Sequence, residues 1–121
     1  MVSIMVIEDE PQSARLAKTV LNRAGFEVFV AEDGEDGITS SLRHAPDLIL
    51  CDLGLPDMDG QTVVALLRQQ PGMSETPIVA FTAWPMDKAT EMAEAYGCDG
   101  VISKPIDTRT FAEEVSAYLR A

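Results

Sequence analysis

The sequence has few basic residues and few cysteines. Nine lysines and arginines stand against twenty aspartates and glutamates, which gives a formal net charge of −11 over 121 residues. Such an excess of negative charge repels nucleic-acid phosphates, so we expect no DNA or RNA partner. The two cysteines do not indicate a disulfide, because Cys51 lies within an apolar run and is better explained as a small core residue.

Long hydrophobic runs are also missing. No apolar run approaches the roughly 18 residues that a membrane-spanning helix needs. The N-terminal sequence MVSIMVI lacks the basic start of a secretory signal and leads straight into three acids. We therefore expect a cytoplasmic protein without a membrane partner. The chain has the length of one domain and shows neither linker nor repeat, which predicts a single domain over residues 1–121.

The chain does contain five short apolar runs, which alternate with five amphipathic stretches. We predict strands at Ser3–Ile7, Glu27–Ala31, Leu48–Asp52, Ile78–Thr82 and Val101–Ser103. Nearly continuous apolar strands are typical of a parallel sheet covered on both faces, and the second, less apolar strand suits an edge. The predicted fold class is α/β, with a doubly wound five-stranded parallel sheet and five helices.

Helical spacing of apolar residues marks the stretches between the strands. Pro11 suits the first turn of the first helix, and Gly25 suits its end. A second helix is predicted over about 34–43, and a fourth over about 86–96. The fourth has a thin apolar stripe, which makes it a candidate for mobility. Asp107 is the predicted N-cap of the last helix.

Side chains that carry chemistry follow several predicted strands at their carboxyl ends, where open α/β sheets bind ligands. They are Glu8, Asp9 and Glu10 after the first strand, Asp52 at the end of the third, Thr82 at the end of the fourth and Lys104 after the fifth. An ionised carboxylate at the end of an apolar strand is unfavourable without a partner. Asp52 therefore needs partners from elsewhere in the chain.

The carboxylates at this edge predict a divalent metal ion. Asp52 beside Glu8 and Asp9 is unfavourable alone, because like charges raise each other's pKa. Mg²⁺ prefers oxygen ligands and binds through a few carboxylates while it keeps several waters. A phosphoryl group would add oxygens, with Lys104 to offset its charge and Thr82 to donate a hydroxyl. Asp52 is then placed to be a phosphoryl acceptor.

Each of these residues also has an ordinary explanation. Three successive acids are often a solvated loop or a helix cap, Thr82 is a good strand residue, and Lys104 alone is usually a surface charge. Their joint placement at the strand ends favours the site. Trp84, two residues after Thr82, is either half-packed on the surface or a side chain that binds a partner or gates the site.

The whole chain resembles a response-regulator receiver domain of the chemotaxis-regulator type, as used in two-component signalling. The matching segments are VIEDEP, DLILCDLGLPDMDG, PIVAFTA and ISKP, in the order and at the spacing of the family. Each segment alone is a weak match, but together they are highly specific. The resemblance implies a flavodoxin-like fold with strand order 2-1-3-4-5. It also implies that a sensor histidine kinase or a histidine phosphotransfer protein donates the phosphoryl group, and that contacts with a downstream protein target then change.

The resemblance implies roles for individual residues. Mg²⁺ would be held by Glu8, Asp9, Asp52 and the backbone carbonyl of Gly54. Asp52 would be the phosphoryl acceptor, Thr82 the switch hydroxyl and Lys104 the lysine that pairs with the phosphate. The switch and partner positions would be Thr82, Ala83, Trp84 and Val101. In this family the bond between Lys104 and Pro105 is commonly cis.

Three positions depart from the commonest pattern of the family. Glu8 stands where Asp is more usual, and its longer arm can still reach a metal. Gly54 provides no side chain over the phosphoryl group, so either water approaches more freely or a partner inserts its own group. Val101 stands where many members carry an aromatic ring that swings inward, and valine has no such rotamer change. Activation would still pass through Thr82 and Ala83 into the fourth predicted helix.

Two other functions stay open. A phosphate-independent interaction module would keep the fold and lose the chemistry, but the acceptor, metal, switch and lysine residues are all present. A Mg²⁺-dependent phosphohydrolase would use Asp52 as nucleophile, but no further general acid stands out, and the single histidine, His44, belongs to the opposite edge of the sheet. The leading prediction is a phosphorylation-dependent switch that is no enzyme, apart from catalysing its own phosphorylation and dephosphorylation. A stand-alone regulator and a receiver cut from a longer protein are both compatible with the chain.

Overall fold

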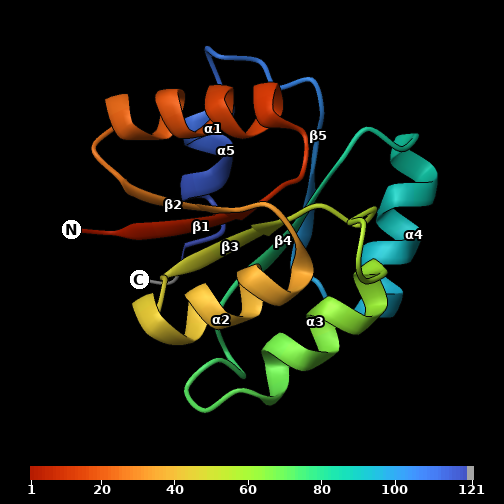
Figure 1. The fold of residues 1–121 in the computed structure, drawn as a ribbon. Helices are drawn as coiled ribbons and strands as arrows, with labels where there is room; N and C mark the ends of the chain where they lie inside the picture. Colours follow the sequence, from red (N-terminus) through yellow and green to blue (C-terminus); the bar gives the residue numbers. More distant parts are fainter. Residues whose placement is uncertain (120–121) are drawn as a thin grey trace.

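The computed structural model describes residues 1–119 and contains a five-stranded parallel sheet (Figure 1). The strands are β1 Ser3–Ile7, β2 Glu27–Ala31, β3 Leu48–Cys51, β4 Ile78–Thr82 and β5 Gly100–Ser103. The helices are α1 Pro11–Arg23, α2 Gly34–His44, α3 Gly60–Gln69, α4 Met86–Tyr96 and α5 Phe111–Ser116. The strand order is β2-β1-β3-β4-β5, with every neighbouring pair parallel. The predicted fold class and strand order are confirmed, and β2 lies at an edge as its composition indicated.

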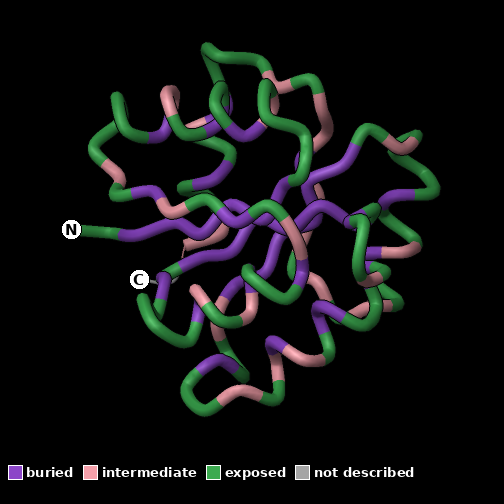
Figure 2. The backbone as a smooth tube through the Cα atoms, in the orientation of Figure 1, coloured by how far each residue is buried: buried purple, intermediate pink, exposed green. Residues whose placement is uncertain are grey.

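Helices cover both faces of this sheet. α1 and α5 pack on one face, and α2, α3 and α4 lie on the other (Figure 1). All residues of β1, β3 and β4 are buried, and these strands run through the centre of the molecule in Figure 2. A strand buried on both faces needs apolar side chains at nearly every position, which explains the runs SIMVI, LILC and IVAFT. Both cysteines are free thiols, as the sequence predicted.

The helix ends follow from local chemistry. Pro11 is the first residue of α1, and the Glu10 carboxylate caps this helix by accepting hydrogen bonds from backbone N–H groups of its first turn. Gly25 has a φ of 96°, a left-handed conformation that suits the predicted helix stop. α4 buries only two alanines and has no side-chain cap at its start. Within residues 1–119, no helix is both long and apolar enough to cross a membrane.

Three predicted boundaries differ from the structure. β3 ends at Cys51, so Asp52 follows the strand, although its N–H still donates to the Ile7 carbonyl at 2.9 Å. β5 begins one residue earlier than predicted. Asp107 is not the N-cap of α5: that position belongs to Thr110. The Asp107 carboxylate instead accepts hydrogen bonds from the backbone and side chain of Arg109, within the turn before the helix.

Candidate functional site

Three carboxylates gather at the carboxyl edge of the sheet. Glu8 and Asp9 follow β1, Asp52 follows β3, and one oxygen of each lies within 4.8 Å of the other two. The parallel pairing of Ile7 with Cys51 brings these two strand ends side by side. Glu8 is 1% exposed and Asp52 is 9% exposed. The structure thus brings together the acids that the sequence predicted, except Glu10, which caps α1 instead.

Lys104 joins two of these acids. Its Nζ lies 2.5 Å from Oε1 of Glu8 and 3.1 Å from Oδ2 of Asp52. The lysine follows β5, and its backbone N–H donates to the Thr82 carbonyl at 2.8 Å, which fixes the start of the side chain beside β4. The bond between Lys104 and Pro105 is cis, as the resemblance implied. The Lys104 ammonium group therefore forms ion pairs with two buried carboxylates.

The electrostatics of the cluster separate the two buried acids. Burial and a hydrogen bond with Asp52 raise the pKa of Glu8 to about 7, although Lys104 opposes this change. Burial also disfavours ionised Asp52, but hydrogen bonds from Glu8 and from the Gly54 N–H, together with Lys104, hold the pKa of Asp52 below its usual value. Burial lowers the pKa of Lys104, but the two carboxylates raise it overall. Asp52 is therefore the ionised acid, and the cluster carries more negative charge than Lys104 alone offsets.

The cluster fits Mg²⁺. Its ligands are carboxylate oxygens at mutual distances that one ion can bridge, and the raised pKa of Glu8 indicates that a further positive charge would be favourable. Gly54 lies beside Asp52, since its N–H donates to Oδ1 of Asp52 at 2.9 Å. This position is compatible with the Gly54 carbonyl as a metal ligand, and that role stays a prediction.

The predicted switch residues occupy the loop between β4 and α4. Thr82 is buried, and its Oγ1 accepts a hydrogen bond from the Trp84 N–H at 3.1 Å. The hydroxyl hydrogen of Thr82 stays available to donate. Ala83 is exposed, whereas Trp84 is half-buried and packs near the start of α4, with Nζ of Lys88 5.1 Å from its ring. Trp84 is thus half-packed, and its backbone N–H is hydrogen-bonded to the Thr82 hydroxyl oxygen.

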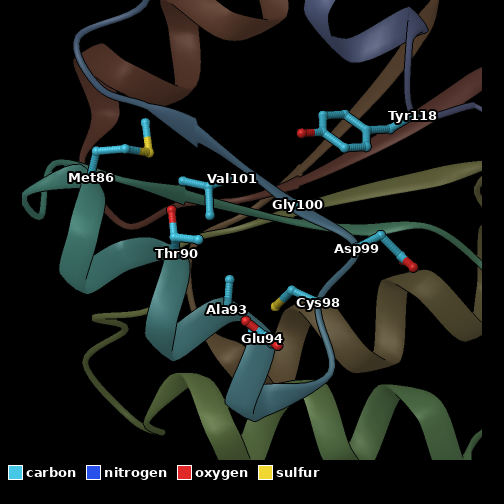
Figure 3. Close-up of a pocket in the computed structure, with 9 residues that line it drawn as sticks. All are labelled: Met86, Thr90, Ala93, Glu94, Cys98, Asp99, Gly100, Val101 and Tyr118. Atoms are coloured by element: carbon cyan, nitrogen blue, oxygen red, sulfur yellow. The ribbon is translucent and has the colours of Figure 1, made fainter.

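Val101 lies beside a cavity of about 460 Å³ between α4 and β5. Figure 3 shows Met86 and Thr90 of α4 beside Val101, and Tyr118 on the other side of β5. The Tyr118 ring covers Gly100 so closely that a Cβ there would come within 2.3 Å of it. Tyr118 thus contributes an aromatic ring to the lining of this cavity. Sequence reasoning missed it, and the only signal was a glycine at the start of a strand.

Asp57 is a second residue that sequence reasoning missed. It lies between β3 and α3, five positions beyond Asp52 in a loop of the motif DLGLPDMDG. Its carboxylate accepts hydrogen bonds from the backbone N–H groups of Gly34, at 2.8 Å, and Glu35, at 3.0 Å. No local pattern indicates this contact, because its partners belong to a distant helix.

The fold and the acidic edge together define a receiver of two-component signalling. Residues 4–116 match the response regulator receiver domain family, and the chain belongs to that family. It is similar to the polar-differentiation response regulator DivK of Brucella anthropi, with 32% identity over 117 residues, which are 97% of this chain and 95% of DivK.

Solved structures agree with this assignment. The chemotaxis protein CheY4 of Vibrio cholerae has a TM-score of 0.91 at 25% identity, covering 98% of this chain and 99% of CheY4. The receiver domain of a signal transduction histidine kinase from Syntrophus aciditrophicus has a TM-score of 0.85 at 26% identity, covering 98% of this chain and 90% of that one. The neighbours therefore include both a regulator and a kinase receiver.

Proposed function

We propose that the chain is a phosphorylation-activated receiver that accepts a phosphoryl group on Asp52 in a Mg²⁺-dependent reaction. The observation that carries this proposal is the position of an ionised, buried Asp52 between Lys104 at 3.1 Å and two further carboxylates within 4.8 Å. The donor would be a sensor histidine kinase or a histidine phosphotransfer protein. Mg²⁺, held by Glu8, Asp9, Asp52 and the Gly54 carbonyl, would supply positive charge beside the phosphoryl oxygens.

The residues of the chain have defined parts in this reaction. A carboxylate oxygen of Asp52 attacks the phosphorus of a phosphohistidine, so that a P–O bond forms while the P–N bond breaks. The protonated ring leaves as neutral imidazole. Lys104 turns from Glu8 toward the phosphoryl oxygens and pairs with them. Attack of water on phosphorus later releases inorganic phosphate and restores the Asp52 carboxylate.

Switching would begin at Thr82. Its hydroxyl donates to the phosphoryl group and moves toward it, which disturbs the hydrogen bond from Trp84. That bond lies directly before the uncapped start of α4. The face formed by α4, β5 and the segment around Tyr118, with its cavity, would then change its contacts with a downstream protein target (Figure 3).

The proposal is tested with Mg²⁺ and beryllofluoride, which mimics a phosphoryl group on a carboxylate. Amide NMR shifts of Thr82 and Trp84 should change in the wild-type chain on adding both reagents. Asp52→Asn keeps the size of the side chain and should show no such response. Unchanged wild-type spectra, or equal responses of the two proteins, would contradict the proposal.

We also propose the setting in which this chemistry acts. Residues 1–121 would form a single cytoplasmic receiver domain without a nucleic-acid or membrane partner. The domain would be no enzyme beyond its own phosphorylation and dephosphorylation. The high coverage of DivK and CheY4 supports a stand-alone regulator, while the similarity to a kinase receiver supports a module of a longer protein.

A further inference from the structure

Asp57 links the acceptor loop to a helix that follows a different strand. This residue lies in the β3–α3 loop, downstream of Asp52. Its Oδ1 accepts the N–H of Gly34 at 2.8 Å, and its Oδ2 accepts the N–H of Glu35 at 3.0 Å. Both N–H groups belong to the first turn of α2, where a helix lacks internal acceptors. Asp57 therefore caps α2 from a loop more than twenty residues away in the sequence.

The start of α2 is capped by two aspartates, which accept different N–H groups. The helix already has its own N-cap, Asp33, which accepts the N–H of Asp36 at 2.8 Å. The loop also packs directly on the start of α2, since a Cβ at Gly34 would come within 2.9 Å of the Met58 sulfur. The contact therefore fixes the position of the loop as much as it stabilises the helix.

The rest of the loop is held by core packing of Leu53 and Leu55 and by hydrogen bonds among its own residues. The Gly54 N–H donates to the Asp52 carboxylate, and Gly54 pairs with Asp59 in a single antiparallel backbone bridge. Asp59 in turn caps α3 by accepting the Thr62 N–H. These contacts make residues 52–62 a connected unit. Among the side-chain hydrogen bonds of residues 52–62, those of Asp57 reach α2. Asp57 therefore ties the loop that contains Gly54 to α2, in addition to the core contacts of Leu53 and Leu55.

We propose that Asp57 is a positioning residue for metal binding and phosphoryl transfer, which acts by holding the Gly54 segment beside Asp52. The inference rests on the proposed function, because it takes the Gly54 carbonyl as a metal ligand. Asp57 is not one of the three carboxylates of the acid cluster. It therefore acts through the loop, in the way that outer residues orient the ligands of a metal.

The test compares Asp57→Ala with Asp33→Ala. Each variant removes one carboxylate and one negative charge from the same end of α2, where Asp57 accepts two N–H groups and Asp33 accepts one. Thermal unfolding therefore measures the loss of helix stability in each variant separately from the change in metal affinity. The Mg²⁺ dissociation constant is measured by calorimetry, the rate of phosphorylation by acetyl phosphate is followed by intact mass, and thermal unfolding is recorded for both. We expect Asp57→Ala to weaken Mg²⁺ binding about tenfold, the lower end of effects seen for outer-shell partners of metal ligands. Asp33→Ala should stay within about twofold of the wild type, because it leaves the loop in place.

Two further results make the comparison decisive. Excess Mg²⁺ should restore the phosphorylation rate of Asp57→Ala, since its acceptor and lysine are intact. Asp57→Asn keeps one acceptor oxygen, so its Mg²⁺ affinity should lie between those of the wild type and Asp57→Ala. If Asp57→Ala does not fold, Asp57→Asn is compared with Asp33→Asn instead. Equal Mg²⁺ affinities of the Asp57 and Asp33 variants would overturn the role of Asp57. Failure of the wild-type chain to bind Mg²⁺ or to take phosphate would instead overturn the proposed function.

Discussion

Asp52 keeps its charge at the end of a buried strand because it has partners in its own loop and in two other segments of the chain. The Gly54 N–H and the Lys104 ammonium each bind one carboxylate oxygen. Glu8 also pairs with Lys104, but burial disfavours its ionised form and raises its pKa to about 7. Two buried acids with one lysine thus separate into an ionised acceptor and an acid that holds a proton near neutral pH.

This separation predicts how stability depends on pH in the metal-free protein. The pKa of Glu8 rises from 4.5 to about 7 on folding, so the folded state holds a proton that the unfolded state releases between these values. Stability therefore falls as pH rises through that window. Glu8→Gln, which cannot ionise, should be more stable than the wild type at pH 8, on the order of 2 kcal/mol, with little difference near pH 4.5. Urea unfolding in a chelator measures this, and a pH-independent difference would contradict it.

We predict that Gly54, which has no side chain, leaves Asp52 open to water. A Cβ at this position would lie 3.8 Å from Oδ1 of Asp52, an ordinary contact, so a larger side chain is tolerated. Gly54→Leu should cover the phosphoryl group and lengthen its lifetime roughly 3- to 10-fold, which corresponds to about 1 kcal/mol in the barrier to hydrolysis. Gly54→Ala should change it much less. The decay of the phosphorylated form, followed by intact mass, gives the lifetimes, and equal decay of all three proteins would refute this role.

At the scale of elements, α4 has one fixed end and one loosely held end. The Arg68 guanidinium, from α3, donates to the Gly97 carbonyl and to Asp99 at the C-terminal end of α4, at 3.1 Å and 2.9 Å. Asp99 also accepts the Ile78 N–H of β4. The start of α4 has no comparable contact, since Pro85 offers no side-chain cap. Movement of the β4–α4 loop is therefore expected to displace the start of α4 rather than its end.

Trp84 should report this movement. Its ring packs near α4, and its N–H is bonded to Thr82, so its fluorescence is expected to change with Mg²⁺ and again with beryllofluoride. Thr82→Val removes the hydroxyl at nearly constant size. In this variant the Mg²⁺ response should remain and the beryllofluoride response should be lost. A flat wild-type signal, or the same two responses in both proteins, would count against a switch at Thr82.

The elements also show how far the sequence determines the structure. Strands of a covered parallel sheet are continuous apolar runs, so β1 and β4 were predicted to the residue, as was the less apolar edge strand β2. The carboxyl ends of β1, β3, β4 and β5 located the acids, Thr82 and Lys104. The start of α5 was wrong because the Asp107 side chain bonds to Arg109, which no propensity indicates. The roles of Asp57 and Tyr118 depend on contacts between segments far apart in the chain, and a single sequence does not reveal such contacts.

On the scale of the whole molecule, the strand order brings the site together. β1 and β3 are neighbours in the middle of the sheet, with β4 and β5 beside them, so four strand ends meet at one edge. Cys51 belongs to the core beneath them, and Cys98 packs against that core. Burial raises the pKa of Cys51 strongly and that of Cys98 to about 11.

Thiol reactivity should therefore follow the global stability of the fold. In the folded chain Cys51 should be inert to a thiol reagent such as dithionitrobenzoate at pH 8, because it is fully buried and protonated. Half-buried Cys98 should react slowly. Both should react at once in denaturant. Fast reaction of Cys51 without denaturant would contradict this prediction, because it would show that the buried strand β3 opens locally.

Chemical trapping of the phosphorylated residue tests the central claim most directly. The chain is incubated with acetyl phosphate, with or without Mg²⁺, and then reduced with borohydride, which converts an aspartyl phosphate to homoserine. Peptide mass spectrometry locates the converted residue. We predict homoserine at position 52, formed only with Mg²⁺. Conversion at another acid, or conversion of Asp52 to the same extent without Mg²⁺, would contradict the account.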